Sequence, residues 1–256
     1  MKTLYFSSTG NCLYIAKCLG GECLSVPELI DEGVYEIKDE EVGIVFPVYG
    51  LCIPPFIEEF LREIKIECNY LFAIATYGFF PGSICDEVSK ITLANGRKFD
   101  YIKTIKMAEN CITFADMEKQ IGDSKKQQEA IDQIMSDISE RLMFVKKESI
   151  FKRVLTNNHK KKYEYPTGTG ITEEITINET CAGCGLCTRL CPMGNIHIED
   201  GHPKFSQNCI SCGACIQNCP MNAIHHCKEK SAVRYRNPHV EVNELIQDIA
   251  VRKGRE

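Results

Sequence analysis

Two cysteine-rich runs carry the most distinctive chemistry of this sequence. The first reads CAGCGLCTRLCP from residue 181, and the second reads CISCGACIQNCP from residue 209, which is 28 positions later. In both runs the cysteines follow the spacing C-x2-C-x2-C-x3-C, and a proline comes next. Three thiolates at this spacing wrap one iron–sulfur cubane, and the fourth thiolate of the run reaches the other cubane. The pattern therefore predicts two [4Fe–4S] clusters.

The crossing of the fourth ligands assigns every cysteine of the two runs to one cluster. One cluster is expected to be bound by Cys181, Cys184, Cys187 and Cys219. The other is expected to be bound by Cys209, Cys212, Cys215 and Cys191. Structural zinc sites close with four ligands in paired C-x-x-C units, and disulfides need an oxidising compartment. Neither alternative accounts for eight thiols in this phased repeat.

A stretch near the N-terminus, SSTGNC at residues 7–12, has groups that can bind an anion. It lies between an expected strand and an expected helix, whose start offers unpaired N–H groups and the positive end of the helix dipole. Gly10 permits a tight backbone, and hydrogen-bond donors are added by Ser7, Ser8, Thr9 and Asn11. The stretch matches neither G-x-G-x-x-G nor a Walker sequence, so NAD and ATP are not favoured. A plain helix cap is the alternative interpretation.

Two more loops carry aromatic and glycine residues directly after apolar, strand-like runs. The residues of interest in the first loop are Pro47, Val48, Tyr49 and Gly50. Those in the second loop are Thr76, Tyr77, Gly78, Phe79 and Gly82. In open parallel sheets, ligands bind at the carboxyl ends of the strands, which is where both loops are expected. Packing at the rim of the core is the alternative role for each aromatic ring.

The elements that must position these loops alternate over the first 147 residues. The strand-like segments are 3–7, 41–49, 70–78 and 100–108, and the helix-like segments are 12–20, 54–64, 83–96 and 124–147. Alternation of this kind indicates an α/β fold, with a parallel sheet covered by helices on both faces. Right-handed crossovers restrict the sheet to a few doubly wound topologies.

Residues 7–12 resemble the phosphate loop of flavodoxins, usually written S/T-x-T-G-x-T. Cys12 departs from that pattern, because a thiol is a weaker hydrogen-bond partner than the usual threonine. The resemblance implies a doubly wound sheet of order 2-1-3-4-5 that binds FMN. It also implies that the loops at 47–50 and 76–82 hold the isoalloxazine ring, with Tyr49, Tyr77 and Phe79 as the candidates for stacking on it.

The cysteine runs resemble bacterial two-cluster ferredoxins, a small α+β fold. The two halves together resemble the EFR1-type flavodoxin–ferredoxin fusion proteins of anaerobes. The expected parts are an FMN-binding domain at 1–165, a ferredoxin domain at 166–230 and a tail at 231–256. The basic stretch 151–170 is interpreted as a linker, with a docking face for an acidic electron carrier as the alternative. An apolar stripe at Val242, Leu245, Ile246 and Ile249 predicts a tail helix that packs back on the first domain.

Composition narrows the classes of partner. The formal net charge of −5 over 256 residues argues against nucleic acid. No apolar run approaches the roughly 18 residues that a membrane span needs. The N-terminus enters a strand-like run without a signal-peptide pattern, so a cytoplasmic location is expected. The oligomeric state is left open by the sequence.

The sequence therefore predicts electron transfer between two [4Fe–4S] clusters and one FMN. A flavin exchanges one or two electrons, so it would convert between one-electron and two-electron chemistry. The expected partners are redox proteins such as a ferredoxin, a flavodoxin or an oxidoreductase. An FMN-dependent reductase of a small molecule such as a quinone, fed by the clusters, is the alternative, and a thiol-based redox sensor is a third. No general acid, general base or nucleophile is identified.

Overall fold

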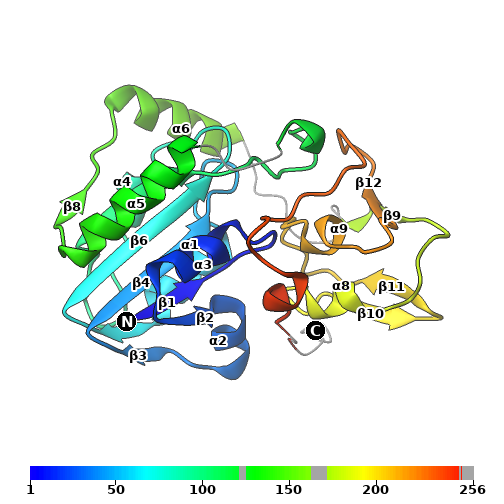
Figure 1. The fold of residues 1–256 in the computed structure, drawn as a ribbon, viewed down its shortest axis with the longest axis horizontal. Helices are drawn as coiled ribbons and strands as arrows, with labels where there is room; N and C mark the ends of the chain where they lie inside the picture. Colours follow the sequence, from blue (N-terminus) through cyan, green and yellow to red (C-terminus); the bar gives the residue numbers. More distant parts are fainter. Residues whose placement is uncertain (121–124, 163–171, 248, 250–256) are drawn as a thin grey trace. The chain divides into compact units, whose positions relative to one another are not determined.

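The computed structural model describes residues 1–120, 125–162, 172–247 and 249. The chain divides into two compact units, each of which is drawn in Figure 1. The first unit comprises Met1–Ser7, Asn11–Ala108 and the described part of Asp123–Glu164. The second comprises Ser8–Gly10 and the described parts of Glu109–Gly122 and Tyr165–Glu256. Three residues of the SSTGNC stretch thus group with the unit that holds both cysteine runs.

A six-stranded parallel sheet forms the centre of the first unit. Its strands, in spatial order, are β2 (Glu22–Ser25), β1 (Lys2–Tyr5), β4 (Glu41–Pro47), β6 (Tyr70–Tyr77), β7 (Tyr101–Lys106) and β8 (Phe144–Val145). A separate parallel pair joins β3 (Glu36–Lys38) to β5 (Lys65–Glu67). The sheet therefore has one more strand than the five expected, because β8 extends the edge beside β7.

The central strands β4 and β6 are buried almost throughout, as their unbroken apolar sequences predict. Gly43 in β4 lies opposite Phe72 in β6. A Cβ atom at Gly43 would lie 2.2 Å from the ring of Phe72, so the missing side chain provides the space for that ring. The glycine is therefore a packing feature of the sheet rather than a weak point in a strand.

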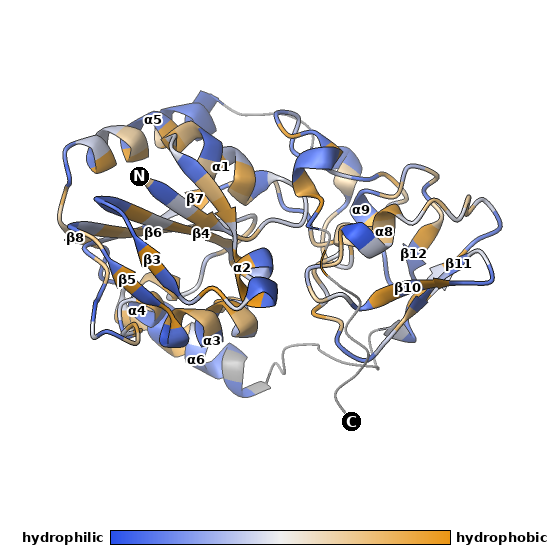
Figure 2. Cartoon of the chain, turned by 90° about the horizontal axis from the view of Figure 1, so that it is seen from below, coloured by the Kyte–Doolittle hydropathy of each residue, from blue (hydrophilic) through white to orange (hydrophobic). Residues whose placement is uncertain are grey.

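Helices cover both faces of this sheet. Figure 2 shows α1 (Asn11–Leu19) and α5 (Lys125–Ser139) on one face, and α3 (Pro55–Glu63) and α4 (Ile84–Val88) on the other. Two further helices of the described part of this unit are α2 (Val26–Glu32) and α6 (Ile150–Lys162).

Two helices of the first unit are shorter than their sequences predict. The helix expected at 83–96 ends at Val88. The helix expected at 124–147 ends at Ser139, because Arg141 takes a positive φ of 50° and Leu142 N–H donates to the Asp137 carbonyl at 2.9 Å. A left-handed residue followed by this backward hydrogen bond is a common way to end a helix. The chain is then free to form strand β8.

The segment from 151 to 162 is helical, so the linker interpretation is wrong for these residues. Helix α6 is fixed to the first unit by Thr156, which is fully buried and accepts a 3.0 Å hydrogen bond from the Ser83 N–H. The remainder of the expected linker, 163–170, lies outside the described residues.

The described part of the second unit contains two short antiparallel pairs and, inside the cysteine runs, two small helices. One pair joins β10 (Ile196–Glu199) to β11 (His202–Phe205), and the other joins β9 (Ile175–Ile177) to β12 (Ile224–His226). Helices α8 (Leu186–Arg189) and α9 (Ala214–Gln217) each lie inside one cysteine run. The core packs Ile112, Ile216 and Ile224 against three of the run cysteines, Cys187, Cys215 and Cys219.

In the part of the tail that the structure describes, Val242–Leu245 form a 3-10 turn where a longer helix was expected. Ile246 already has extended backbone, with φ −70° and ψ 134°, so the predicted helix does not continue through it. Residues 248 and 250–256 lie outside the described part of the chain. Among the described helices, none has the length and apolar character needed to cross a membrane.

Candidate functional site

The two cysteine runs adopt matching backbone conformations. Helix α8 follows Gly185, with φ 74°, and helix α9 follows Gly213, with φ 70°. Gly183 and Ser211 are equivalent positions and have φ values of 62° and 52°. A Cβ atom at Gly183 would lie 2.6 Å from the carbonyl oxygen of Gly201, so the first run needs glycine there. The 28-residue repeat of the sequence is therefore a repeat of structure.

Backbone donors point at the fourth cysteine of each run. Asn195 N–H donates to Cys191 Sγ at 3.3 Å, and Ala223 N–H donates to Cys219 Sγ at 3.3 Å. Each donor lies four residues beyond its cysteine, so this contact obeys the same repeat. Hydrogen bonds of this kind favour the thiolate, which is the form that binds metal, and they tune the potentials of iron–sulfur clusters.

The fold brings the fourth cysteine of each run to the opposite run. Cys219 lines one cavity together with Cys181, Cys184 and Cys187, and Cys215 of the second run also reaches this cavity. Burial raises the pKa of the Cys212 thiol, and the negative charge of nearby Cys191 and Cys209 raises it further. Cys191 therefore lies among the cysteines of the second run. The eight thiols of the two runs, five of which line this cavity, are a donor set that fits two cubanes.

Burial also controls the protonation of these thiols in the absence of metal. It raises the pKa of Cys187 to about 11, with the charges of Cys184 and Cys181 adding to the effect. It raises the pKa of Cys215 well above the usual value as well. These thiols are protonated at neutral pH until a metal binds, so cluster assembly must release protons.

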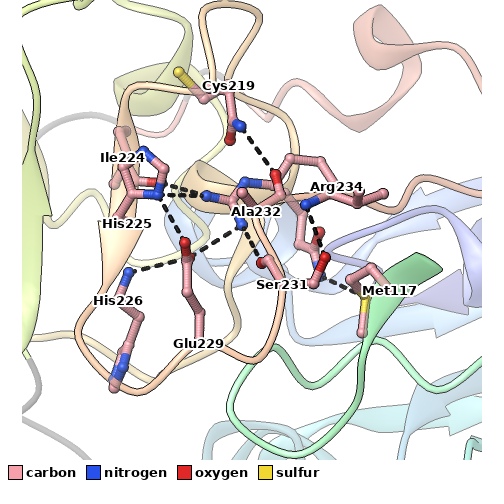
Figure 3. Close-up of polar contacts among 12 residues, drawn as sticks. Met117, Cys219, Ile224, His225, His226, Glu229, Ser231, Ala232 and Arg234 are labelled. Carbon is pink, nitrogen blue, oxygen red and sulfur yellow. Dashed lines mark hydrogen bonds and ion pairs between the residues drawn. The ribbon is translucent and has the colours of Figure 1, made fainter. Parts of the chain in front are cut away.

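A polar network ties the segment after the second run to strand β12 (Figure 3). Arg234 donates to Glu229 Oε2 and to the Ile224 carbonyl, both at 3.1 Å. His225 Nδ1 lies 2.7 Å from Glu229 Oε1. Partial burial opposes ionisation of Glu229, but the hydrogen bonds from His225 and Arg234 outweigh it and lower the pKa of this carboxyl. The network fixes the chain that leads from the cysteine runs into the tail.

Thr9 in the SSTGNC stretch is 2% exposed and is held by two amides of the second unit. Its hydroxyl oxygen accepts a hydrogen bond from Asn110 Nδ2, and its carbonyl accepts one from Asn237 N–H at 2.8 Å. Within the described residues, the structure shows no acceptor for the proton of the Thr9 hydroxyl. A buried donor in this state fits an anionic acceptor, because an unmatched buried donor is costly.

The neighbouring residues of the stretch are also held closely. The Ser8 carbonyl accepts a 3.0 Å hydrogen bond from Asn218 Nδ2, and Asn218 directly precedes Cys219. Gly10 has a φ of 93°, and a Cβ atom there would lie 2.9 Å from Val240 Cβ. Asn110, Asn218 and Asn237 were not expected at this stretch, because they come from distant segments without a recognisable motif.

Asn11 and Cys12 of the SSTGNC stretch belong to the first unit, and their side chains make contacts within it. Asn11 Nδ2 donates to the Ala108 carbonyl at 3.2 Å. Cys12 is buried in helix α1, and its Sγ lies 3.1 Å from Thr76 Oγ1. Burial raises the pKa of Cys12 to about 12, and the contact with Thr76 lowers it only in part. The thiol at position 12 is thus a neutral partner of another candidate residue, Thr76.

The loop after β4 makes a tight turn. Tyr49 and Cys52 exchange two backbone hydrogen bonds of 2.9 Å, and the residues between them, Gly50 and Leu51, have φ values of 54° and 66°. Two consecutive positive φ values define a type I′ hairpin turn. Tyr49 meets Phe6 edge to face, with 6.2 Å between ring centroids. Pro47 and Val48 lead from β4 into this turn.

The loop after β6 extends from the end of the strand to helix α4. Thr76 is buried, Tyr77 and Gly78 are half-buried, and Phe79 is exposed. A Cβ atom at Gly82 would lie 2.9 Å from Thr156 Oγ1, so helix α6 packs directly on this loop. Thr156 was not anticipated, because its helix was interpreted as a linker. Both ring-binding candidates therefore lie at the carboxyl ends of neighbouring strands, β4 and β6.

A further group of ligand-type side chains, Glu174, His226 and Cys227, gathers in the second unit. His226 Nε2 lies 3.1 Å from Glu174 Oε2, and His226 Nδ1 accepts the Lys228 N–H at 3.1 Å. An imidazole that binds a metal normally donates through its other nitrogen. Here that nitrogen accepts, and Lys228 also pairs with Glu174, so the group fits an ion-paired cluster better than a metal centre.

A family model described as a 4Fe-4S dicluster domain matches residues 180–224. The match spans both cysteine runs, so the second unit carries an iron–sulfur domain. A candidate flavoprotein from Bacteroides uniformis is similar in structure at 14% identity, over 53% of this chain and 97% of its own, with a TM-score of 0.33. The Trp repressor binding protein from Bacillus subtilis is 12% identical over 58% of this chain and 100% of its own, also with a TM-score of 0.33. No curated protein matches the chain.

Proposed function

We propose that this protein transfers electrons between two [4Fe–4S] clusters and one FMN. The observation that carries the proposal is the repeat of thiol spacing, backbone conformation and N–H···S contacts in the two cysteine runs. When bound, the clusters supply one-electron steps, and the flavin supplies one- and two-electron steps. The expected partners are other redox proteins.

The first cluster is assigned to Cys181, Cys184, Cys187 and Cys219, and the second to Cys191, Cys209, Cys212 and Cys215. The shared cavity of the first set and the charge coupling around Cys191 support this assignment. The N–H groups of Asn195 and Ala223 stabilise the thiolates of the fourth ligands. In the second set Cys191 is buried and Cys209, Cys212 and Cys215 are half-buried, which limits the access of water to a bound cluster.

The FMN is assigned to a flavodoxin-like first domain at 1–165, followed by the ferredoxin domain at 166–230 and the tail at 231–256. The phosphate is proposed to bind at SSTGNC, where the unmatched hydroxyl proton of Thr9 and the start of helix α1 favour an anion. The residues proposed to line the ring are Tyr49, Gly50, Tyr77, Gly78 and Phe79. Their place at the ends of β4 and β6 supports this role.

Chemical analysis of protein purified without oxygen tests the proposal. We expect about eight iron, eight acid-labile sulfide and one FMN per chain, the content of two cubanes and one flavin. Four iron or stoichiometric zinc would contradict the cluster assignment. FAD in place of FMN, or protein that binds neither when flavin is supplied, would contradict the flavin assignment.

Removing the Thr9 hydroxyl should weaken FMN binding. We expect Thr9→Val to raise the Kd for FMN about 5- to 150-fold, because a hydrogen bond to a charged phosphate is lost. Thr9→Ser keeps the hydroxyl and is the matched control. Fluorescence quenching during titration of flavin-free protein measures both constants. If the valine and serine variants bound FMN with equal affinity, SSTGNC would be a helix cap and not a phosphate site.

A further inference from the structure

Helix α6 presents an unusual outer face. Ile150 and Phe151 are 78% and 76% exposed, and Val154 and Leu155 are 52% and 43% exposed. The spacing i, i+1, i+4, i+5 places these four side chains on one stripe of the helix. A contiguous stripe of large apolar side chains in solvent marks a surface that another molecule covers.

The same helix is fixed beside the loop that we assign to the flavin ring. Thr156 accepts the Ser83 N–H at 3.0 Å and lies against Gly82. Lys152 Nζ lies 5.6 Å from the centroid of the Phe80 ring, and Arg153 pairs with Asp86. A molecule that covers the apolar stripe would therefore lie next to the loop after β6.

The charge of the helix points to an anionic partner. Its sequence, IFKRVLTNNHKKK, contains five lysine or arginine residues and no carboxylate, although the whole chain carries a net charge of −5. In the first turn of the helix these charges are neutralised, because Lys152 pairs with Glu148 at 3.0 Å and Arg153 pairs with Asp86. Lys147 before the helix and Lys161 in its last turn are exposed, and no carboxylate within the described part of the chain pairs with either of them.

This arrangement disfavours two alternative occupants. In an antiparallel pair of α6 helices from two copies of the chain, Lys147 of one copy would face Lys161 of the other, so like charges would repel. A helix that lies on an anionic membrane carries basic residues along its whole polar face, whereas the two cations in the first turn of α6, Lys152 and Arg153, are already paired with carboxylates. An apolar centre with a charged rim is the anatomy of a protein–protein interface.

We propose that the outer face of α6, defined by Ile150, Phe151, Val154 and Leu155 with Lys147 and Lys161 at its ends, docks an acidic electron-carrier protein. The proposal rests on the proposed function, since it names the partner of the flavin site. Each encounter passes one electron between the two proteins. Two such encounters, together with two protons from water, supply the two electrons and two protons of a full flavin reduction. Small interfaces of this kind are typical of transient electron-transfer complexes.

Binding of an immobilised acidic bacterial two-cluster ferredoxin to the full chain tests the docking face. We expect the double variant Ile150→Ser and Phe151→Ser to bind at least tenfold more weakly than the unaltered protein. The double variant Lys147→Gln and Lys161→Gln should lose most of the salt dependence of binding. Met143→Ser is the control, since Met143 is 69% exposed but lies outside α6. It should bind as the unaltered protein does.

The readout separates this proposal from the proposed function, because binding is measured whether or not FMN is present. Protein that takes up no flavin when FMN is supplied, but still binds ferredoxin through α6, would contradict the flavin assignment and keep the docking face. FMN-containing protein whose binding is absent, independent of salt or unaffected by the α6 variants would overturn the docking face. Sedimentation with phosphatidylserine vesicles that depends on Ile150 and Phe151, without ferredoxin binding, would also overturn it in favour of a membrane surface.

Discussion

Replacing Cys191 with alanine is expected to remove about half of the iron from the protein, about four of eight atoms for one cubane of two. The lost cluster should be the one held by Cys209, Cys212 and Cys215, although Cys191 belongs to the first run in the sequence. Burial and the charges of Cys191 and Cys209 raise the pKa of Cys212, which places Cys191 within the second group of thiols. Iron and sulfide analysis of protein purified without oxygen measures the loss.

Double variants identify which cluster is lost. Adding Cys191→Ala to Cys212→Ala should remove no further iron, because both ligands serve the same cluster. Adding Cys191→Ala to Cys184→Ala should remove nearly all of it. Cys227→Ala is the matched control, since Cys227 is an exposed thiol outside the repeat. If Cys191→Ala instead removed further iron from the Cys212→Ala variant and none from the Cys184→Ala variant, the fourth ligands would not cross over.

The second large effect is expected at Gly10. An alanine at Gly10 would have to adopt a φ of 93°, and its Cβ atom would lie 2.9 Å from Val240 Cβ and 3.0 Å from Asn237 Cβ. Backbone strain of this kind costs about 1–3 kcal/mol, and the overlap must in addition displace the loop. We therefore expect Gly10→Ala to weaken FMN binding about 100-fold, which corresponds to about 2.8 kcal/mol.

Gly20 provides a control near the other end of helix α1. It has a φ of 79°, but a Cβ atom there would meet nothing within 4 Å. Gly20→Ala should lower the free energy of unfolding by about 1–2 kcal/mol through backbone strain alone, with no change in FMN affinity. Thermal unfolding and flavin titration separate the two effects. Equal flavin affinity in both variants would mean that the SSTGNC backbone does not hold the phosphate.

The parts of the fold that the sequence predicts best are those governed by local rules. The spacing of the cysteines is set by the geometry of a cubane, so the motif is readable without the fold. The buried strands β4 and β6 are continuous apolar runs, and few other structures suit such runs. The dicluster-domain match covers the region where the cysteine pattern predicts iron–sulfur binding.

The parts that could not be predicted depend on distant contacts. Helix α6 looks like a solvated linker because its apolar stripe faces outward and its attachment uses Thr156 and ion pairs instead of apolar residues. The spacing of the tail residues Val242 and Leu245 fits a 3-10 turn as well as an α-helix. The backbone then becomes extended at Ile246. The amides of Asn110 and Asn237 reach Thr9 only because the fold brings remote segments together.

Transfer of electrons within one chain is the central claim, and a stopped-flow measurement without oxygen tests it most directly. Clusters are reduced first by a limited amount of dithionite, and the loss of oxidised-flavin absorbance is then followed at several protein concentrations. Because both cofactors are proposed to belong to the same chain, tethering replaces diffusional encounter. The flavin should be reduced at a single rate that does not depend on protein concentration. A rate proportional to protein concentration, or flavin that stays oxidised while the clusters are reduced, would contradict it.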